Sequence, residues 1–108
     1  MKRAYTRKQL FEMNFPVSDY DFPHGNGTFD GVLVMKKWGD RNVLICYFDT
    51  DQGEKLKLCA WFKRDSKKDY RPKHSDLDMS KVEIGTDLRV NYSTRNSGKT
   101  LWESAEII

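Results

Sequence analysis

The stretch from Asn42 to Arg64 places the tightest constraint on how this chain of 108 residues can fold. Two runs rich in Val, Ile, Leu and aromatic residues flank the polar turn Thr50-Asp51-Gln52-Gly53, and a glycine there can take the positive φ that hairpin loops often need. The second run alternates between two faces. One face holds Leu56, Leu58, Ala60 and Phe62, and the other holds Lys55, Lys57, Cys59, Trp61 and Lys63. The sequence therefore predicts a β-hairpin with one apolar face and one face that carries lysines and an indole.

The register of the two runs decides which side chains lie beside those lysines. The hypothesis that Asp49 pairs with Glu54 across a four-residue loop places Ile45 opposite Leu58. The other side of the hairpin then gathers Leu44, Cys46, Phe48, Lys55, Lys57, Cys59 and Trp61. Such a surface is too apolar to face water alone, and three uses remain open. It binds single-stranded nucleic acid, it is covered by another segment of the same chain, or it contacts a second subunit.

Length and charge are those expected of one small, mildly basic domain. The chain has 19 Lys and Arg against 16 Asp and Glu, a formal net charge of +3. Residues 63–73 concentrate the positive charge, with Lys63, Arg64, Lys67, Lys68, Arg71 and Lys73 against Asp65 and Asp69. Either solvation of a surface loop or contact with a polyanion explains this local excess.

The two cysteines, Cys46 and Cys59, bear on the redox environment of the chain. The register above puts them on one face of neighbouring strands, where a cross-strand disulfide is geometrically allowed. Because no apolar run near Met1 has the length of a secretory signal, we expect a cytoplasmic protein with free thiols. No stretch of the sequence has the length and apolar character of a membrane span, so we expect no membrane partner.

The first 27 residues read as a helix followed by an irregular segment. Thr6-Arg7-Lys8-Gln9 has the form of a capping box, and it predicts a short helix that ends near Asn14, before Pro16. The segment 15–27 is loop-like in composition. It nevertheless carries the spaced apolar residues Phe15, Val17, Tyr20 and Phe22. We expect these side chains to pack into an apolar patch, and the outer face of the hairpin is the candidate.

Three further strands are predicted by alternation, over residues 28–38, 87–94 and 99–108. In the first of them Phe29, Gly31, Leu33 and Met35 are expected to share a face, with a bend at the glycine. The turn Arg95-Asn96-Ser97-Gly98 joins the last two strands into a second hairpin. The charged residues 65–76 form a connection, and residues 76–81 are expected to form a helical turn capped by Asp76 or Ser75.

This succession of one long strand, a hairpin, a charged connection and a second hairpin resembles the OB-fold, a small five-stranded β-barrel. The resemblance is carried by the strand that contains Gly31, by the hairpin Asn42–Arg64, and by Ile84–Val90 with Gly98–Trp102. It covers Thr28 to Ile108 at the level of architecture and indicates no narrower family. It implies an all-β, single-domain chain (1–108), in which the N-terminal helix and extended segment (1–27) pack on an OB-like barrel (28–108).

Nucleic-acid-binding OB-folds typically use the outer surface of strands two and three with the flanking loops. By position, the resemblance implicates Phe48, Lys55, Lys57, Trp61 and Lys63, and in the following loop Arg64, Lys67, Lys68, Tyr70, Arg71 and Lys73. Exposed rings stack on bases and cationic groups neutralise phosphates, so these residue types suit the task. Weaker candidates are Trp38 beside Lys36 and Lys37, and Trp102 beside Arg89.

We therefore expect a binder of single-stranded DNA or RNA with little sequence preference. The chain stops at Ile108 without the acidic-tipped tail typical of bacterial single-strand-binding proteins, so we expect an accessory factor of a phage or mobile element. The alternative is a protein–protein interaction or oligomerisation module, such as a homodimer, that binds no nucleic acid.

Other chemistry has little support in the sequence. The run Asn96–Thr100 ends like a phosphate-binding loop but has Ser93 where the first glycine belongs. The run Asp49–Glu54 lacks the third ligand and the distal Glu of a calcium loop. His24 and His74 have no Cys or His at zinc spacing. A mid-strand cysteine is usually a small apolar filler. We expect no enzyme, no metal and no cofactor.

Overall fold

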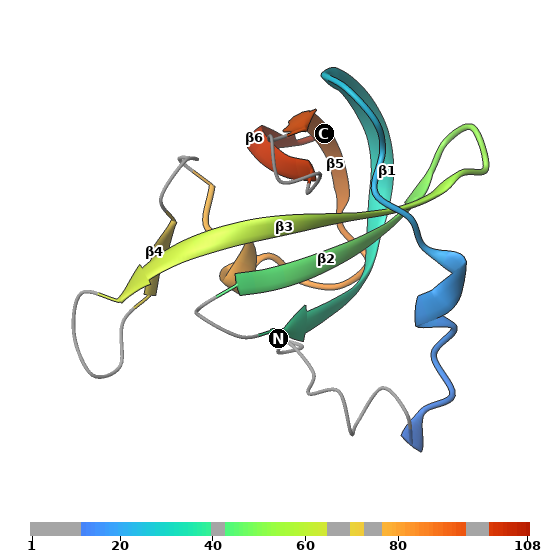
Figure 1. Ribbon diagram of the computed structural model, residues 1–108, viewed down its shortest axis with the longest axis horizontal. Coiled ribbons are helices and arrows are strands. Elements are labelled where there is room, and N and C mark those ends of the chain that lie inside the picture. The colour runs from blue at the N-terminus through green and yellow to red at the C-terminus, as the bar shows by residue number, and fades with distance from the viewer. Residues whose placement is uncertain (1–11, 40–42, 65–69, 73–76, 95–99) are drawn as a thin grey trace.

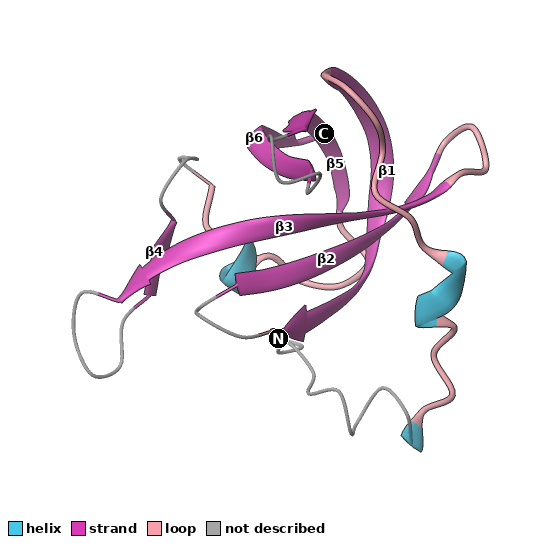
Figure 2. Ribbon diagram, in the orientation of Figure 1, coloured by secondary structure: helices cyan, strands magenta, loops and turns pink. Residues whose placement is uncertain are grey.

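The chain adopts a mostly β fold in the computed structural model (Figures 1 and 2), which describes residues 12–39, 43–64, 70–72, 77–94 and 100–108. The strands are β1 (Gly27–Trp38), β2 (Val43–Thr50), β3 (Lys55–Arg64), β4 (Tyr70–Pro72), β5 (Asp87–Thr94) and β6 (Thr100–Ile107). Two short 3-10 turns accompany them, η1 (Val17–Asp19) and η2 (Met79–Lys81). The expectation of an all-β chain is thus confirmed at the level of a mostly β fold.

The strands are ordered β2-β1-β5-β6-β3-β4, and β2 also pairs with β3. All pairs are antiparallel except β3 with β6, which run parallel and meet at Cys59 and Leu101. The first half of β1 pairs with β5 and its second half with β2, so this strand bends between them (Figure 1). Gly31 lies at the bend, where a Cβ would stand 2.9 Å from the Asp49 carbonyl oxygen. The predicted bend is confirmed, and the close approach explains the glycine.

Strand positions agree closely with the alternation in the sequence, whereas short elements differ. The short strand β4 lies inside the predicted charged connection, and it ends at Pro72, a residue that suits an edge position. The helical turn η2 is capped by Asp78, whose side chain accepts from the Ser80 backbone N–H, and not by Asp76 or Ser75. The predicted N-terminal helix lies almost wholly outside the described residues.

The predicted register of the central hairpin is wrong by one residue. Asp49 pairs with Lys55, not with Glu54, and Ile45 pairs with Cys59. The loop between the strands has three residues, 51–53, because the Thr50 N–H donates to the Glu54 carbonyl at 2.9 Å and Gly53 takes φ 84°. Three-residue hairpin loops commonly end on a residue in this left-handed conformation. Since side chains alternate along a strand, the slip moves every side chain of β2 to the other face.

The core lies on the inner face of the sheet. Its fully buried members are Leu33, Leu44, Cys46, Phe48, Leu58, Ala60, Phe62, Met79, Leu88 and Val90. Phe48 is 0% exposed, so its assignment to an outer binding face is wrong. Burial of each leucine or phenylalanine stabilises the fold by about 1.5–3 kcal/mol, which is why the slip observed here is the favoured register.

A β-bulge in β1 changes which of its side chains point inward. The register with β2 shifts between Leu33 and Met35, so that Met35 joins a cluster on the outer face instead of sharing a face with Leu33. The same shift turns Lys36 and Trp38 inward. The Trp38 ring packs on Phe62 with ring centroids 5.5 Å apart, so Trp38 is partly buried against the core.

Lys36 is fully buried, and its ammonium is held by backbone carbonyls around η2. Nζ donates to the carbonyl oxygens of Met79 (3.3 Å), Ser80 (3.1 Å) and Val82 (2.6 Å). Burial lowers the pKa of Lys36, and nearby acidic groups oppose this shift. A buried charge is tolerated here because all three of its protons have acceptors. Lys36 thus fixes η2 against β1 and offers nothing to a ligand.

Replacement of this ammonium tests its structural role. We expect Lys36→Met to lower the free energy of unfolding by about 1–3 kcal/mol, because carbonyls around η2 lose their donor. Urea denaturation monitored by tryptophan fluorescence measures the change. The matched control is Lys81→Met, which removes an exposed ammonium from the same turn and should change stability by less than about 0.5 kcal/mol. Equal effects of the two substitutions would contradict the assignment.

Candidate functional site

The outer face of the β2–β3 ribbon is the surface on which the sequence places a binding site. With the observed register, β2 contributes Val43, Ile45, Tyr47 and Asp49, and β3 contributes Lys55, Lys57, Cys59 and Trp61. Three of the predicted site residues, Lys55, Lys57 and Trp61, therefore do share this face. Phe48 does not, because it lies in the core.

An N-terminal strap, residues 15–22, covers part of this face. Tyr20 is 3% exposed and belongs to a cluster with Met35 and Tyr47, against which Phe15 also packs. The Tyr20 ring stacks on Phe15 at 5.4 Å between centroids and meets Tyr47 edge-on at 5.3 Å. Phe15 and Tyr20 thus pack on the hairpin as expected, whereas Val17, which was expected to pack there too, is exposed. Of the three uses left open by the sequence, cover by the same chain applies to this part of the face.

The strap is also attached to β3 through the backbone. The Asp21 N–H donates to the Lys55 carbonyl at 3.3 Å, and the Lys57 N–H donates to the Asp21 carbonyl at 3.0 Å. This isolated parallel bridge satisfies backbone groups at the edge of β3 near the hairpin tip. It continues the sheet by one residue and directs Phe22 toward the ribbon.

A polar contact fixes the strap beside Lys55. The Tyr20 hydroxyl donates to Asp49 Oδ1 at 2.7 Å, and Lys55 Nζ lies 3.5 Å from the same oxygen. Lys55 Nζ also lies 5.2 Å from the centroid of the Tyr20 ring. Burial, and then the hydrogen bond to Asp49, raise the pKa of Tyr20 well above its usual range. Lys55 therefore has partners within the protein.

The strap ends next to Trp61. Phe22 and Trp61 pack against the same small cluster, formed by Val43 and Cys59. Lys57 Nζ lies 4.9 Å from the centroid of the Phe22 ring, a cation–π contact. Trp61 itself is half-buried, and it lies on the outer face, where it packs against Val43 and Cys59.

The backbone brings part of the basic stretch alongside the end of β3. In the pairing of β3 with β4, Lys63 is opposite Arg71 and Arg64 is opposite Tyr70. Figure 1 shows this two-stranded extension projecting beyond the rest of the sheet. The side chains of these four residues lie outside what the structure describes, as do Lys67, Lys68 and Lys73 altogether. The register therefore joins two basic sequence segments that alternation alone leaves apart.

The two cysteines lie on opposite faces of the sheet, which corrects the predicted arrangement. Cys46 is in the core and Cys59 is on the outer face beneath the strap, and neither is in a disulfide. Burial raises the pKa of the Cys46 thiol well above its usual range. Because the two cysteines lie on opposite faces, the cross-strand disulfide that the assumed register allowed is excluded.

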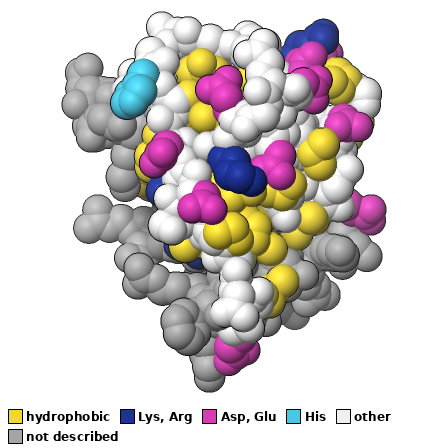
Figure 3. Space-filling model, turned by 90° about the vertical axis from the view of Figure 1, so that its right-hand side faces the viewer, with side chains coloured by type: hydrophobic (Ala, Val, Ile, Leu, Met, Phe, Trp, Pro, Cys, Tyr) yellow, Lys and Arg dark blue, Asp and Glu magenta, His cyan; other side chains and the backbone are white. Residues whose placement is uncertain are grey.

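An acidic cleft of about 1090 Å³ lies between the strap, the tip of the β2–β3 hairpin, β1 and β5. Its lining includes the rings of Phe22, Phe29 and Tyr92 and the acidic residues Asp19, Asp21, Asp30, Asp51 and Glu54. Figure 3 shows acidic side chains spread over this side of the molecule with hydrophobic side chains between them. Sequence reasoning missed this cleft, although the absence of Lys and Arg from residues 12–30 is a signal of it.

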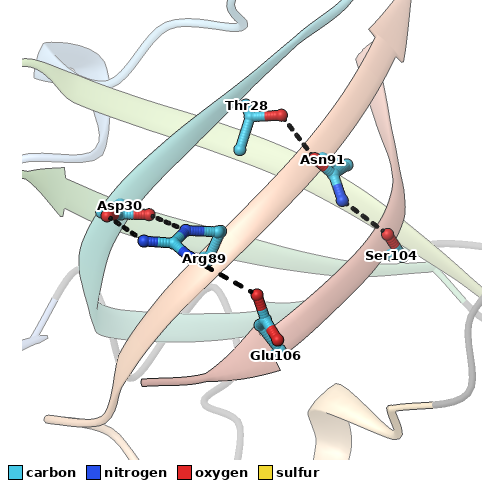
Figure 4. Close-up of polar contacts among 6 residues, drawn as sticks. All are labelled: Thr28, Asp30, Arg89, Asn91, Ser104 and Glu106. Carbon is cyan, nitrogen blue, oxygen red and sulfur yellow. Dashed lines mark hydrogen bonds and ion pairs between the residues drawn. The ribbon is translucent and has the colours of Figure 1, made fainter.

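Arg89, a weaker candidate from the sequence, is engaged in a polar ladder across β1, β5 and β6 (Figure 4). Its Nε and Nη2 donate to the two Asp30 carboxylate oxygens at 2.9 and 3.1 Å, and Nη1 lies 3.7 Å from Glu106 Oε1. The hydrogen bond from Arg89 lowers the pKa of Asp30. A second row on the same face joins Thr28 to Asn91 and Asn91 to Ser104. The structure describes Trp102 through its backbone alone.

Comparison of the chain with protein-family models, with curated proteins and with solved structures finds no match. Within the described ranges, no group of three or more His, Cys, Asp and Glu side chains is arranged to hold a metal ion. None of the helical segments described here has the length and apolar character needed to cross a membrane.

The raised pKa of Tyr20 predicts an alkaline loss of stability. The protonated hydroxyl stabilises the fold fully below the unfolded-state pKa of about 10, and this stabilisation is lost as the pH rises above it toward the folded-state value. Tyr20→Phe should lower the unfolding free energy by about 1–2 kcal/mol at neutral pH and weaken its decline between about pH 9 and 11. Urea denaturation at a series of pH values measures both effects.

Tyr92→Phe is the matched control, because the Tyr92 hydroxyl makes no hydrogen bond within the described part of the chain. The Tyr92 variant should keep the wild-type pH profile. A decline that Tyr20→Phe leaves unchanged would assign the alkaline effect to another group, such as Tyr47, whose pKa burial also raises.

Proposed function

We propose that this chain is a small OB-like barrel protein that binds single-stranded DNA or RNA at the Trp61 end of β3. The observation that carries the proposal is the position of Trp61. Its half-buried indole lies on the outer face of the ribbon, just beyond the part covered by the strap and just before the basic extension formed by β3 and β4.

The pairing order supports an OB-like barrel. Strand β1 pairs with β2 and β5, β2 pairs with β3, β5 pairs with β6, and β6 returns to β3 in parallel orientation. An order in which each of these five strands has two neighbours is that of a small barrel with one parallel junction. The remaining strand, β4, is an addition at the end of β3.

The chemistry at this end suits an unpaired strand of nucleotides. An accessible indole stacks on bases of any identity, and cationic side chains near it neutralise phosphates, so binding needs little sequence preference. The relevant positions are Trp61, Lys63, Arg64, Tyr70 and Arg71, with Lys67, Lys68 and Lys73 in the intervening and following sequence. Lys55 and Lys57 contribute less, because each already contacts a ring of the strap.

The distribution of charge favours the same end. Carboxylates gather around the cleft at the hairpin tip, whereas the basic excess of residues 63–73 belongs to the opposite end of β3. A polyanion is repelled from the first region and attracted to the second. The molecule is therefore electrostatically polarised along β3, and this polarity orients an approaching strand.

Titration of a fluorescently labelled oligo-dT of about 15 nucleotides tests the proposal. Fluorescence anisotropy should show binding that weakens markedly between about 50 and 200 mM salt. Trp61→Ala should weaken binding by about 5- to 150-fold, since it removes a stacking surface worth about 1–3 kcal/mol, and Trp61→Phe should retain most of the affinity. Lys63→Ala combined with Arg71→Ala should reduce the salt dependence by about one to two phosphate contacts.

Lys81→Ala is the charge control, because Lys81 is an exposed lysine of η2 that is not among the proposed binding residues. It should leave the affinity and its salt dependence nearly unchanged. Absence of binding to both oligo-dT and poly-U at tens of micromolar protein, at the lower salt concentration, would reject the proposal.

Protein–protein association is the second candidate. Ile107 and Ile108, at the end of β6, are 61% and 54% exposed, an unusual position for two consecutive large apolar residues. Light scattering after size exclusion distinguishes this candidate. A stable dimer that Ile107→Ser abolishes, together with no affinity for oligonucleotides, would favour an interaction module.

A further inference from the structure

We infer that the N-terminal strap is an autoinhibitory cover of the nucleic-acid face, and that its displacement lengthens the binding surface from Trp61 toward the hairpin tip. This inference rests on the proposed function and concerns the regulation of the same site. The strap lies on the outer face of the very strands, β2 and β3, whose exposed end carries the proposed interface.

The strap occupies the face with the same kinds of contact that a nucleic-acid strand makes. Its rings cover Tyr47 and Cys59, which are 2% and 3% exposed. Tyr47 would otherwise present an aromatic ring on the outer face for base stacking. Phe15 and Tyr20 pack on that ring, with centroids 5.4 and 5.3 Å away. Intramolecular rings thus take the places that bases would take.

The strap also occupies the cationic groups of the face. Lys55 Nζ and Lys57 Nζ lie 5.2 and 4.9 Å from the centroids of the Tyr20 and Phe22 rings. Asp49, held by the Tyr20 hydroxyl, attracts Lys55 as well. Removal of the strap would free the Lys57 ammonium and the Tyr47 ring on the same face as Trp61, and would leave Lys55 beside Asp49 of β2.

The polar attachments of the strap are few. Within the described residues, one backbone bridge at Asp21 and the hydrogen bond from Tyr20 to Asp49 connect it to β2 and β3, and the remaining contacts are those of its three rings. Its helical turn η1 contains no buried residue. Phe22 is the member nearest to the proposed interface, since it shares the Val43–Cys59 cluster with Trp61.

Competition between the strap and the nucleic acid predicts in which direction the observed affinity changes when the strap is loosened. If the full face binds only when the strap is displaced, the observed affinity is the intrinsic affinity multiplied by the fraction of molecules that are open. A substitution that loosens the strap without touching the ribbon should therefore tighten binding. A strap that merely completes the fold should have the opposite effect or none.

The test compares Phe22→Ala with the wild-type protein by anisotropy titration of labelled oligo-dT. We expect Phe22→Ala to bind about tenfold more tightly, as the open fraction rises. Val17→Ala is the matched control, because Val17 is an exposed apolar residue of the same strap and should leave the affinity unchanged. Alkylation of Cys59 by iodoacetamide, located by mass spectrometry, reports strap opening independently, and Cys46 in the core reports intact folding.

The outcomes distinguish a failure of the autoinhibition hypothesis from a failure of the proposed nucleic-acid binding. Faster alkylation of Cys59 with tighter binding supports the inference. Faster alkylation of Cys59 with unchanged or weaker binding overturns it, because the uncovered face then plays no part in binding. Cys59 that stays protected in Phe22→Ala and in the double variant with Tyr20→Ala also overturns it, because the strap is then not the cover. If neither wild type nor any variant binds, the proposed function itself fails.

Discussion

The second edge of β3 is the feature on which the arrangement of this molecule depends. One edge of this ten-residue strand pairs with β2, and the backbone groups of the other edge must also find partners when they are buried. Three separate segments supply them. Asp21 pairs at Leu56, Leu101 pairs at Cys59, and β4 pairs at Phe62–Arg64.

This division of one edge explains why distant parts of the sequence meet on β3. Different parts of β3 pair with the strap, with the start of β6 in the second hairpin, and with β4 in the charged connection. It also explains why the two ends of β3 differ in chemistry. The strap adds acidic residues at the hairpin tip, and β4 adds one basic residue, Arg71, in register with Lys63 at the far end, so strand pairing contributes to the difference in charge.

The sequence predicted the strands well because alternation and turn residues are local signals. The bounds of β1, β2, β3, β5 and β6 lie within one residue of those that the pattern indicates. The register of the hairpin was beyond such signals, because Thr50-Asp51-Gln52-Gly53 is compatible with a three-residue or a four-residue loop. That single residue decided whether Phe48 faced a ligand or the core.

Two further features of the site depended on information that is not local. The bulge in β1 places Lys36 on the inner face, where its ammonium donates hydrogen bonds to three backbone carbonyls. The alternation of residues in that strand does not distinguish such a lysine from one exposed to water. The aromatic spacing of residues 15–22 correctly indicated a segment that packs on the hairpin. It did not indicate that Lys55 and Lys57 would pair with those rings, since that requires the three-dimensional path of the strap.

Within the described residues, β3 and β6 pair at one position, Cys59 with Leu101, and this has a consequence for local opening of the sheet. In the described part of this ladder, no adjacent residue pair supports the one between Cys59 and Leu101. We therefore expect the sheet to open first between β3 and β6. Separation there exposes the edges of both β3 and β6, and exposed strand edges can pair with other chains. Because β3 shares its second edge among three segments, its junction with β6 is short, and heat-induced aggregation of this protein would start from that junction.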